Sequence, residues 1–88
     1  MKFRIPEDIL FREIEGEAVL LNIRTGVYFG LDKMGTAIWQ RIQKKKRLEQ
    51  VVDEMLQDFD VDRKTCEQDL REFTARLEKN NLLLIENG

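Results

Sequence analysis

The front of the chain alternates short apolar segments with turn residues. The three segments are ILFREI (9–14), AVLLNI (18–23) and VYFGL (27–31). They are rich in the aliphatic, β-branched and aromatic residues that strands favour. EGE (15–17) predicts a turn between the first two segments, and RTG (24–26) predicts a turn between the last two. The pattern therefore predicts three consecutive antiparallel strands.

A three-residue loop that ends in Gly26 suits a type I turn followed by a left-handed glycine. This loop fixes a register that pairs Ile23 with Val27, Leu21 with Phe29 and Val19 with Leu31. Because side chains alternate along a strand, all six residues fall on one face, which we expect to cover the core. The opposite face then carries Ala18, Leu20, Asn22, Tyr28 and Gly30. The phase of the first strand stays open, because its turn can hold two or three residues.

The rest of the chain has helical periodicity, which predicts helices near 33–44, 48–58 and 63–80. Asp32 and Asp62 are expected to cap the first and third of these. Their apolar stripes consist of Met34, Ile38 and Ile42 with Ala37 and Trp39 beside them, then Leu48, Val51, Val52, Met55 and Leu56, then Cys66, Leu70, Phe73 and Leu77. LLLIE (82–86) predicts a short strand or a packing segment.

Three strands followed by three helices predict an α+β fold in which helices cover one face of a three-stranded antiparallel sheet. A meander with three helices resembles the winged helix-turn-helix architecture. At 88 residues, one domain spanning 1–88 is expected, with a modest core. Gly35 falls in the first turn of the first helix, where a missing side chain allows close packing.

Composition argues against most catalytic and metal chemistry. The chain has no histidine, one cysteine and no glycine-rich phosphate loop. We therefore expect no catalytic residues, no metal and no cofactor. Cys66 falls within the apolar stripe and is expected to be a small core residue rather than a reactive thiol.

The charge pattern bears on location and partners. Fifteen basic and seventeen acidic residues give a net charge of -2, which argues against a nucleic-acid binder. KKKR (44–47) has two interpretations: basic residues at the negative end of a helix dipole, or a phosphate-binding patch. We favour the first, because four basic residues in an acidic chain are weak evidence for a phosphate site. Leu82–Ile85 is too short to span a membrane, and four charges within the first ten residues differ from a secretory signal. A cytoplasmic location without a membrane partner is expected.

LLNIRTGVYFGLDKMGTAIW (20–39) resembles the PqqD-like family, the peptide-recognition domains of ribosomal peptide modification. The residues that match the family pattern are Asn22, Thr25, Gly26, Tyr28, Leu31, Asp32, Gly35, Ile38 and Trp39. LEQVVDEMLQDFDVD and DLREFTARLEKNNLLL are similar to the family's second and third helices, so the resemblance covers about residues 9–85. One departure is Asn81, which stands where many members have glycine; asparagine also tolerates a left-handed conformation.

The resemblance implies a peptide-binding function without catalysis. Such domains bind the leader segment of a precursor peptide and present it to a modifying enzyme or leader peptidase, as in lasso-peptide pathways. The leader adds as a strand to the third strand and lies beside the third helix. Carried over to this sequence, the peptide-binding residues are Val27, Tyr28, Phe29, Gly30 and Leu31 on the strand, and Asp69, Leu70, Phe73 and Arg76 on the helix.

Several of these residues have simpler interpretations. Asp69 and Arg76 lie about 20° apart on a helical wheel, so they either orient a leader or are ordinary solvated charges. Tyr28 either serves a second surface or is a half-buried sheet residue. Gly30 either leaves room for a close backbone approach or marks a bulge. In the predicted register, the N–H groups of Tyr28 and Gly30 point toward the free edge.

Two other functions remain open. A winged-helix DNA-binding protein would read a groove with RKTCEQDLREFTARLEKNN (63–81), although this segment has mixed charge. An adaptor subunit would dock a partner enzyme without using a peptide groove. Salt-dependent binding to random duplex DNA would indicate the first function, and indifference to a leader peptide would indicate the second.

Overall fold

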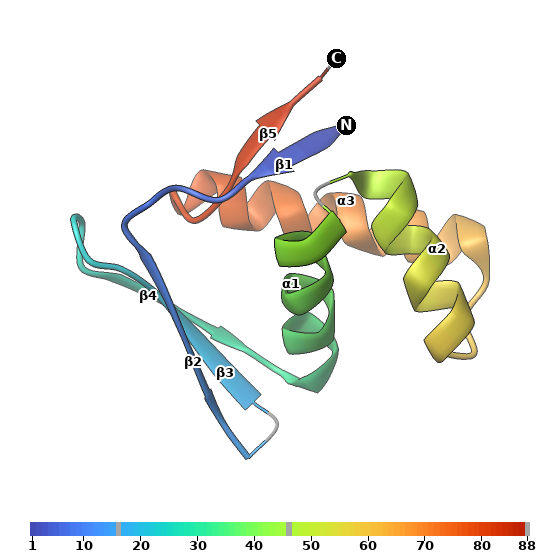
Figure 1. Cartoon of the computed structure of the whole chain (residues 1–88), viewed down its shortest axis with the longest axis horizontal. Helices are drawn as coiled ribbons and strands as arrows, with labels where there is room; N and C mark the ends of the chain where they lie inside the picture. Colours follow the sequence, from blue (N-terminus) through green and yellow to red (C-terminus); the bar gives the residue numbers. More distant parts are fainter. Residues whose placement is uncertain (16, 46, 88) are drawn as a thin grey trace.

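The computed structural model describes residues 1–15, 17–45 and 47–87. Its elements in chain order are β1 (Lys2–Arg4), β2 (Ile9–Ile14), β3 (Glu17–Asn22), β4 (Val27–Leu31), α1 (Lys33–Lys45), α2 (Leu48–Asp58), α3 (Arg63–Lys79) and β5 (Leu84–Glu86). Strands β2, β3 and β4 form an antiparallel sheet in that order, and β1 pairs with β5 in a separate two-stranded sheet (Figure 1). The expected α+β fold is confirmed. Strand β5 lies within the segment 82–86, for which a short strand or a packing segment was predicted. Its pairing with β1 was not expected, because the three residues of β1 are too few to show an alternating pattern.

Two aspartates begin helices, as their positions in the sequence predict. The Oδ1 atom of Asp32 accepts a hydrogen bond from the Gly35 N–H at 2.7 Å, ahead of α1. Asp62 accepts from the Thr65 N–H at 2.8 Å and from the Thr65 hydroxyl at 2.9 Å, ahead of α3. The hydrogen bond from the Thr65 backbone lowers the pKa of Asp62, because it favours the charged carboxylate. Both caps satisfy N–H groups that a helix leaves without partners.

The predicted register between β3 and β4 is wrong by one residue. Asn22 pairs with Val27, Leu20 with Phe29 and Ala18 with Leu31, so four residues form the loop instead of three. The inner face of β3 therefore carries Ala18, Leu20 and Asn22, all buried, whereas Val19 and Ile23 are exposed and Leu21 is half-buried. The predicted face of β4 is confirmed, because Val27, Phe29 and Leu31 do point inward.

Asn22 is the physical reason for the longer loop. Its side-chain oxygen accepts hydrogen bonds from the N–H groups of Arg24 and Thr25, at 3.0 and 3.1 Å. Its backbone carbonyl accepts from the Gly26 N–H at 2.7 Å, and Gly26 adopts a φ of 77°. The side-chain nitrogen donates to the carbonyl of Asn81 at 2.9 Å, beyond the end of α3. A side chain that caps the turn and also bonds to the segment after α3 has to point inward, which reverses the face expected for β3.

The structure also fixes the register of β2, the strand whose inward-facing residues the sequence left open. Ile14 pairs with Glu17, so residues 15 and 16 separate β2 from β3; Gly16 of the predicted turn lies outside the described residues. Glu15 has a φ of 55°, which fits a tight hairpin turn. In this register Ile9 and Phe11 pack against the core from the inner face of the sheet.

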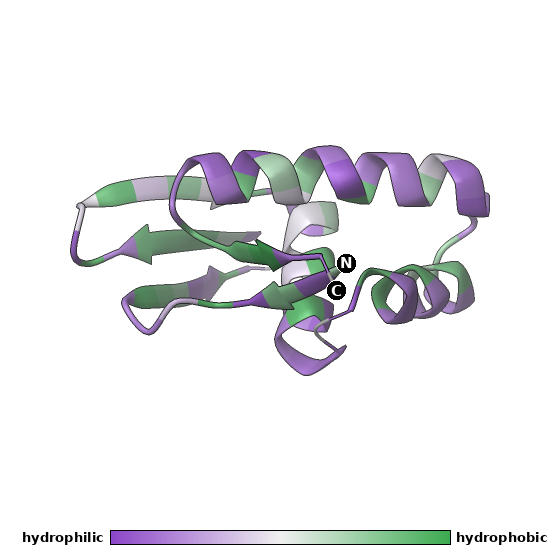
Figure 2. Ribbon diagram, turned by 90° about the horizontal axis from the view of Figure 1, so that it is seen from above, coloured by the Kyte–Doolittle hydropathy of each residue, from purple (hydrophilic) through white to green (hydrophobic). Residues whose placement is uncertain are grey.

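The core lies between the inner face of the sheet and the helices. Trp39 and Ile42 of α1 and Leu20 of β3 are buried in the same core, and α1 packs against β3 and β4. Helix α3 is mostly hydrophilic, with hydrophobic residues at intervals along it (Figure 2). These residues form one buried stripe of Cys66, Leu70, Phe73 and Leu77, as predicted. Met34 was expected in the stripe of α1 but is 41 % exposed, in the first turn of the helix.

The basic segment after α1 is described in part. Lys44 and Lys45 lie in the last turn of α1, as the helix-dipole interpretation predicts, and Lys46 lies outside the described residues. The ammonium group of Lys45 is 3.3 Å from a carboxylate oxygen of Glu54 on α2. In the segments that the structure describes, none of the helices has the length and hydrophobicity needed to cross a bilayer.

Candidate peptide-binding site

Strand β4 forms one edge of the sheet. The direction of its backbone N–H and C=O groups can be derived from the hydrogen bonds on the β2 side of β3. The Ile23 N–H donates to the Asp8 carbonyl at 2.9 Å, which makes this pair a hydrogen-bonded pair next to β2. Bonded and non-bonded pairs alternate in an antiparallel ladder. Residues 19, 21 and 23 therefore bond toward β2, whereas residues 18, 20 and 22 bond toward β4.

The partners of these inner bonds are Val27, Phe29 and Leu31. The N–H and C=O groups of Tyr28 and Gly30 consequently point away from β3. Among the described residues, no strand pairs with that side of β4, so these groups form an open edge. The sequence predicted the same two residues, since the register error shifted β3 and left the alternation along β4 unchanged.

Tyr28 and Gly30 also leave the edge sterically open. Tyr28 is 72 % exposed, so the half-buried interpretation of its side chain is wrong. Gly30 pairs regularly with Val19, so it does not mark a bulge. A Cβ atom added to Gly30 would meet no atom within 4 Å. An extended segment can therefore approach this backbone closely.

The edge opens onto a groove of about 360 Å³ between β4, the start of α1 and α3. Its lining residues are Phe29, Gly30, Leu31, Asp32, Met34, Gly35, Ile38, Asp69, Phe73 and Arg76. The structure therefore brings together six of the nine residues predicted for the site. Leu70 is buried and does not line the groove, and Val27 and Tyr28 lie on the edge strand outside its lining.

Sequence reasoning missed the contribution of α1 to this groove. Met34 and Ile38 come from the first turns of the helix, directly after the edge strand. Their proximity to β4 in the chain was the available signal, but both were assigned to the core stripe. Gly35 lies where this turn meets α3. A Cβ atom at Gly35 would lie 3.2 Å from Asp32 Oδ1, which would have to shift slightly, and in ordinary contact with the ring of Phe73 at 3.5 Å.

Opposite charges flank the apolar floor of the groove. Asp69 and Arg76 are both exposed on α3, on the same flank as Phe73. The guanidinium of Arg76 lies 5.8 Å from the centroid of the Phe73 ring, which places its charge over the groove. Within residues 1–15, 17–45 and 47–87, neither charge forms an ion pair. The groove therefore offers a ligand an apolar surface, the carboxylates of Asp32 and Asp69, and the guanidinium group of Arg76.

The remaining candidate chemistry is limited. Burial raises the pKa of the Cys66 thiol, which keeps the sulfur protonated and poorly nucleophilic. No group of three metal-ligating side chains is found in the part of the chain that the structure describes.

An antiparallel sheet with an open edge over an apolar groove defines a class of peptide-binding domain that acts by strand addition. Residues 17–83 match the family model described as Coenzyme PQQ synthesis protein D (PqqD), and the chain belongs to the PqqD family. The resemblance identified from the sequence is thereby confirmed. No curated protein matches the chain.

Two solved structures are similar over nearly the whole chain. One is described as "TbiB1 in Complex with the TbiA(beta) Leader Peptide"; it is 40% identical, covers 100% of both chains and has a TM-score of 0.88. The other is "Lasso peptide synthetase B1 complexed with the leader peptide"; it is 25% identical, covers 97% of this chain and 100% of that chain, and has a TM-score of 0.85.

Proposed function

We propose that this chain binds the leader segment of a ribosomally made precursor peptide and presents it to a modifying enzyme or leader peptidase, in a lasso-peptide or related pathway. The observation that carries the proposal is the open edge of β4, which faces the groove beside α3. The two similar structures are both complexes with leader peptides, which supports the same function here. We further propose that residues 1–88 act as one peptide-recognition domain.

The proposed binding mode follows from the edge and the groove. The leader extends the sheet as a fourth strand and pairs with the free backbone groups of Tyr28 and Gly30. Because its side chains alternate, every second one points into the groove, where Ile38 and Phe73 favour an apolar residue. Asp69 and Arg76 then select the charge of the neighbouring leader residues. The role of each of these residues stays a prediction.

We also propose that the chain carries out no chemistry itself. It contains no histidine, and its single thiol is buried with a raised pKa. We expect the purified chain to show no peptidase or ligase turnover. Activity from this chain alone that disappeared when a pair of its carboxylates was mutated would contradict the proposal.

A titration tests the proposal directly. The probe is a fluorescein-labelled synthetic peptide with the sequence of the leader encoded beside this gene, and the readout is fluorescence anisotropy. The wild-type chain is expected to bind it. Arg76→Gln should weaken binding about two- to fivefold, the effect of an exposed ion pair worth about 0.4 to 1 kcal/mol.

Arg71→Gln is the matched control for Arg76→Gln. Arg71 is also an exposed arginine of α3, but it pairs with Glu67 at 3.1 Å, away from the groove. This control is expected to bind the leader as the wild type does. Equal losses from both variants would indicate a general charge effect rather than a contact in the groove.

The two alternative functions predict different results. A DNA-binding protein would bind random duplex DNA with strong salt dependence, which the acidic net charge opposes. A pure adaptor would ignore the leader and still bind the enzyme. Failure of the wild type to bind the leader would refute the proposed function.

A further inference from the structure

Both faces of the β2–β3–β4 sheet carry apolar side chains, although the helices pack against only one of them. Eight large hydrophobic side chains are exposed in the described part of the chain; four of these lie on the face away from the helices, and a fifth, Ile23, follows β3 in the adjoining turn. Together with half-buried Leu21, they define what we call the outer face: Leu10, Ile14, Val19, Leu21, Ile23 and Tyr28. A sheet covered on one side normally shows polar residues on the other. The largest exposed apolar patch of a protein is often a functional contact surface.

The register aligns these residues in rows that run toward β4. Leu10, Leu21 and Tyr28 are direct cross-strand neighbours, and the next row consists of Arg12, Val19 and Gly30. Tyr28 is therefore the last member of its row, at the edge where the leader is proposed to add. A leader strand at that edge would extend each row by one side chain. The outer face is thus continuous with the proposed peptide site.

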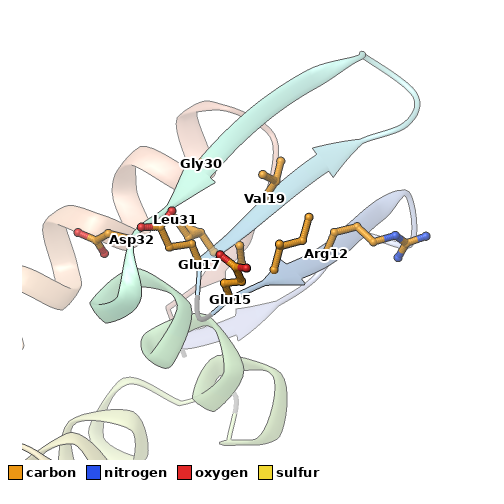
Figure 3. Close-up of a pocket in the computed structure, with 9 residues that line it drawn as sticks. Arg12, Glu15, Glu17, Val19, Gly30, Leu31 and Asp32 are labelled. Carbon is orange, nitrogen blue, oxygen red and sulfur yellow. The ribbon is translucent and has the colours of Figure 1, made fainter.

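One end of the outer face is hollowed and acidic. A hollow of about 650 Å³ lies beside Ile14 and Val19, and Glu15 and Glu17 line it. Figure 3 shows that Arg12 extends its guanidinium away from these two carboxylates. The hollow shares Gly30 with the groove beside α3. A complementary partner therefore has an apolar surface with basic side chains at one end.

The size of the outer face indicates which partner fits it. Three strands about 4.8 Å apart, each six residues of about 3.3 Å, give roughly 300 Å². A stable pair of chains buries about 800 Å² on each partner, so a second copy of this chain would be held too weakly. An enzyme that also holds the precursor in its own active site gains a second attachment through the bound leader. For such a partner a small contact is sufficient, because the second binding event is intramolecular.

Resting on the proposed function, we propose that the outer face is the docking surface for the enzyme that acts on the bound precursor, through an apolar patch with basic side chains at one end. Because the leader extends the rows of the outer face, the enzyme contacts both. The enzyme and the leader then strengthen each other's binding by the same factor.

The experiment measures the affinity of the labelled leader for the chain with and without the purified enzyme encoded beside this gene. A saturating concentration of the enzyme should increase the leader affinity of the wild type about tenfold. Val19→Lys replaces a central apolar side chain of the outer face with a second positive charge beside Arg12, and should abolish this increase while leaving binding of the leader alone unchanged. Val61→Lys is the matched control, because Val61 is also 38 % exposed but lies between α2 and α3. Ile23→Lys repeats the test in a loop, in case Val19→Lys does not fold.

The possible outcomes separate the two proposals. Loss of the increase in Val19→Lys or Ile23→Lys, with the control unaffected, supports docking on the outer face. Retention of the increase in both folded variants overturns it, as does a wild type whose leader affinity the enzyme does not change. A dimer of the wild type that Val19→Lys dissociates also overturns it, because a second copy then occupies the face. Absence of leader binding in every titration without the enzyme refutes the proposed function instead.

Discussion

Proline substitutions along β4 test whether the leader uses this edge. Proline has no N–H group, so its effect depends on where the lost N–H pointed. The Gly30 N–H points to the open edge, and the Phe29 N–H points to β3. Gly30→Pro should therefore weaken leader binding with little loss of stability, whereas Phe29→Pro should destabilise the sheet itself.

The expected magnitudes follow from the groups that lose partners. Gly30→Pro removes one hydrogen bond to the leader and leaves a leader carbonyl facing the proline ring. Together these cost about 1 to 3 kcal/mol, which is about 5- to 150-fold in affinity. Its melting temperature should fall by less than about 5 °C. Phe29→Pro loses an internal bond and a ring that packs on the core, so a loss of at least about 2 kcal/mol and about 10 °C is expected.

Gly30→Ala is the matched control. It retains the N–H group, and its added methyl group meets no atom within 4 Å. Its leader affinity should stay within about twofold of the wild type. The measurements are anisotropy titrations with the labelled leader and thermal melts followed by circular dichroism. If Gly30→Pro folds and binds the leader with full affinity, the leader does not pair with this edge and the strand-addition model is wrong for this chain.

Three further predictions concern stability. Cys66→Ala should cost about 1 kcal/mol in thermal denaturation and leave leader affinity within about threefold, because the thiol only fills the core; lost binding in a folded variant would contradict this. Asn22→Ala should cost about 1 to 3 kcal/mol, measured by urea denaturation, because the carbonyl of Asn81 loses its donor; an unchanged midpoint would show that the bond contributes nothing. The pKa of Asp62 is lowered in the folded chain, so its ionisation stabilises the fold above the ordinary aspartate pKa, and this stabilisation disappears as the pH falls through the lowered value. The melting temperature of Asp62→Asn should therefore approach that of the wild type as the solution is acidified, and a difference that does not change with pH would refute this.

The sequence by itself determined most elements of this fold. Local signals were sufficient for three strands, three helices and both aspartate caps, because each depends on residues within one turn or one strand. The open N–H groups of Tyr28 and Gly30 were also predictable. Their direction depends only on the alternation along β4, which a shift of the partner strand by one residue did not change.

Tertiary contacts decided the remainder. Asn22 points inward because its partner, the carbonyl of Asn81, lies 59 residues further along the chain, and this contact sets the loop length and the face of β3. The pairing of β1 with β5 and the place of Met34 in the groove likewise depend on segments that no local pattern brings together. Strand β3 is apolar on both faces, so hydrophobicity alone did not distinguish its buried side chains from its exposed ones. The contact of Asn22 with Asn81 and the packing of α1 against one face together made that choice, and they left the other face apolar and uncovered.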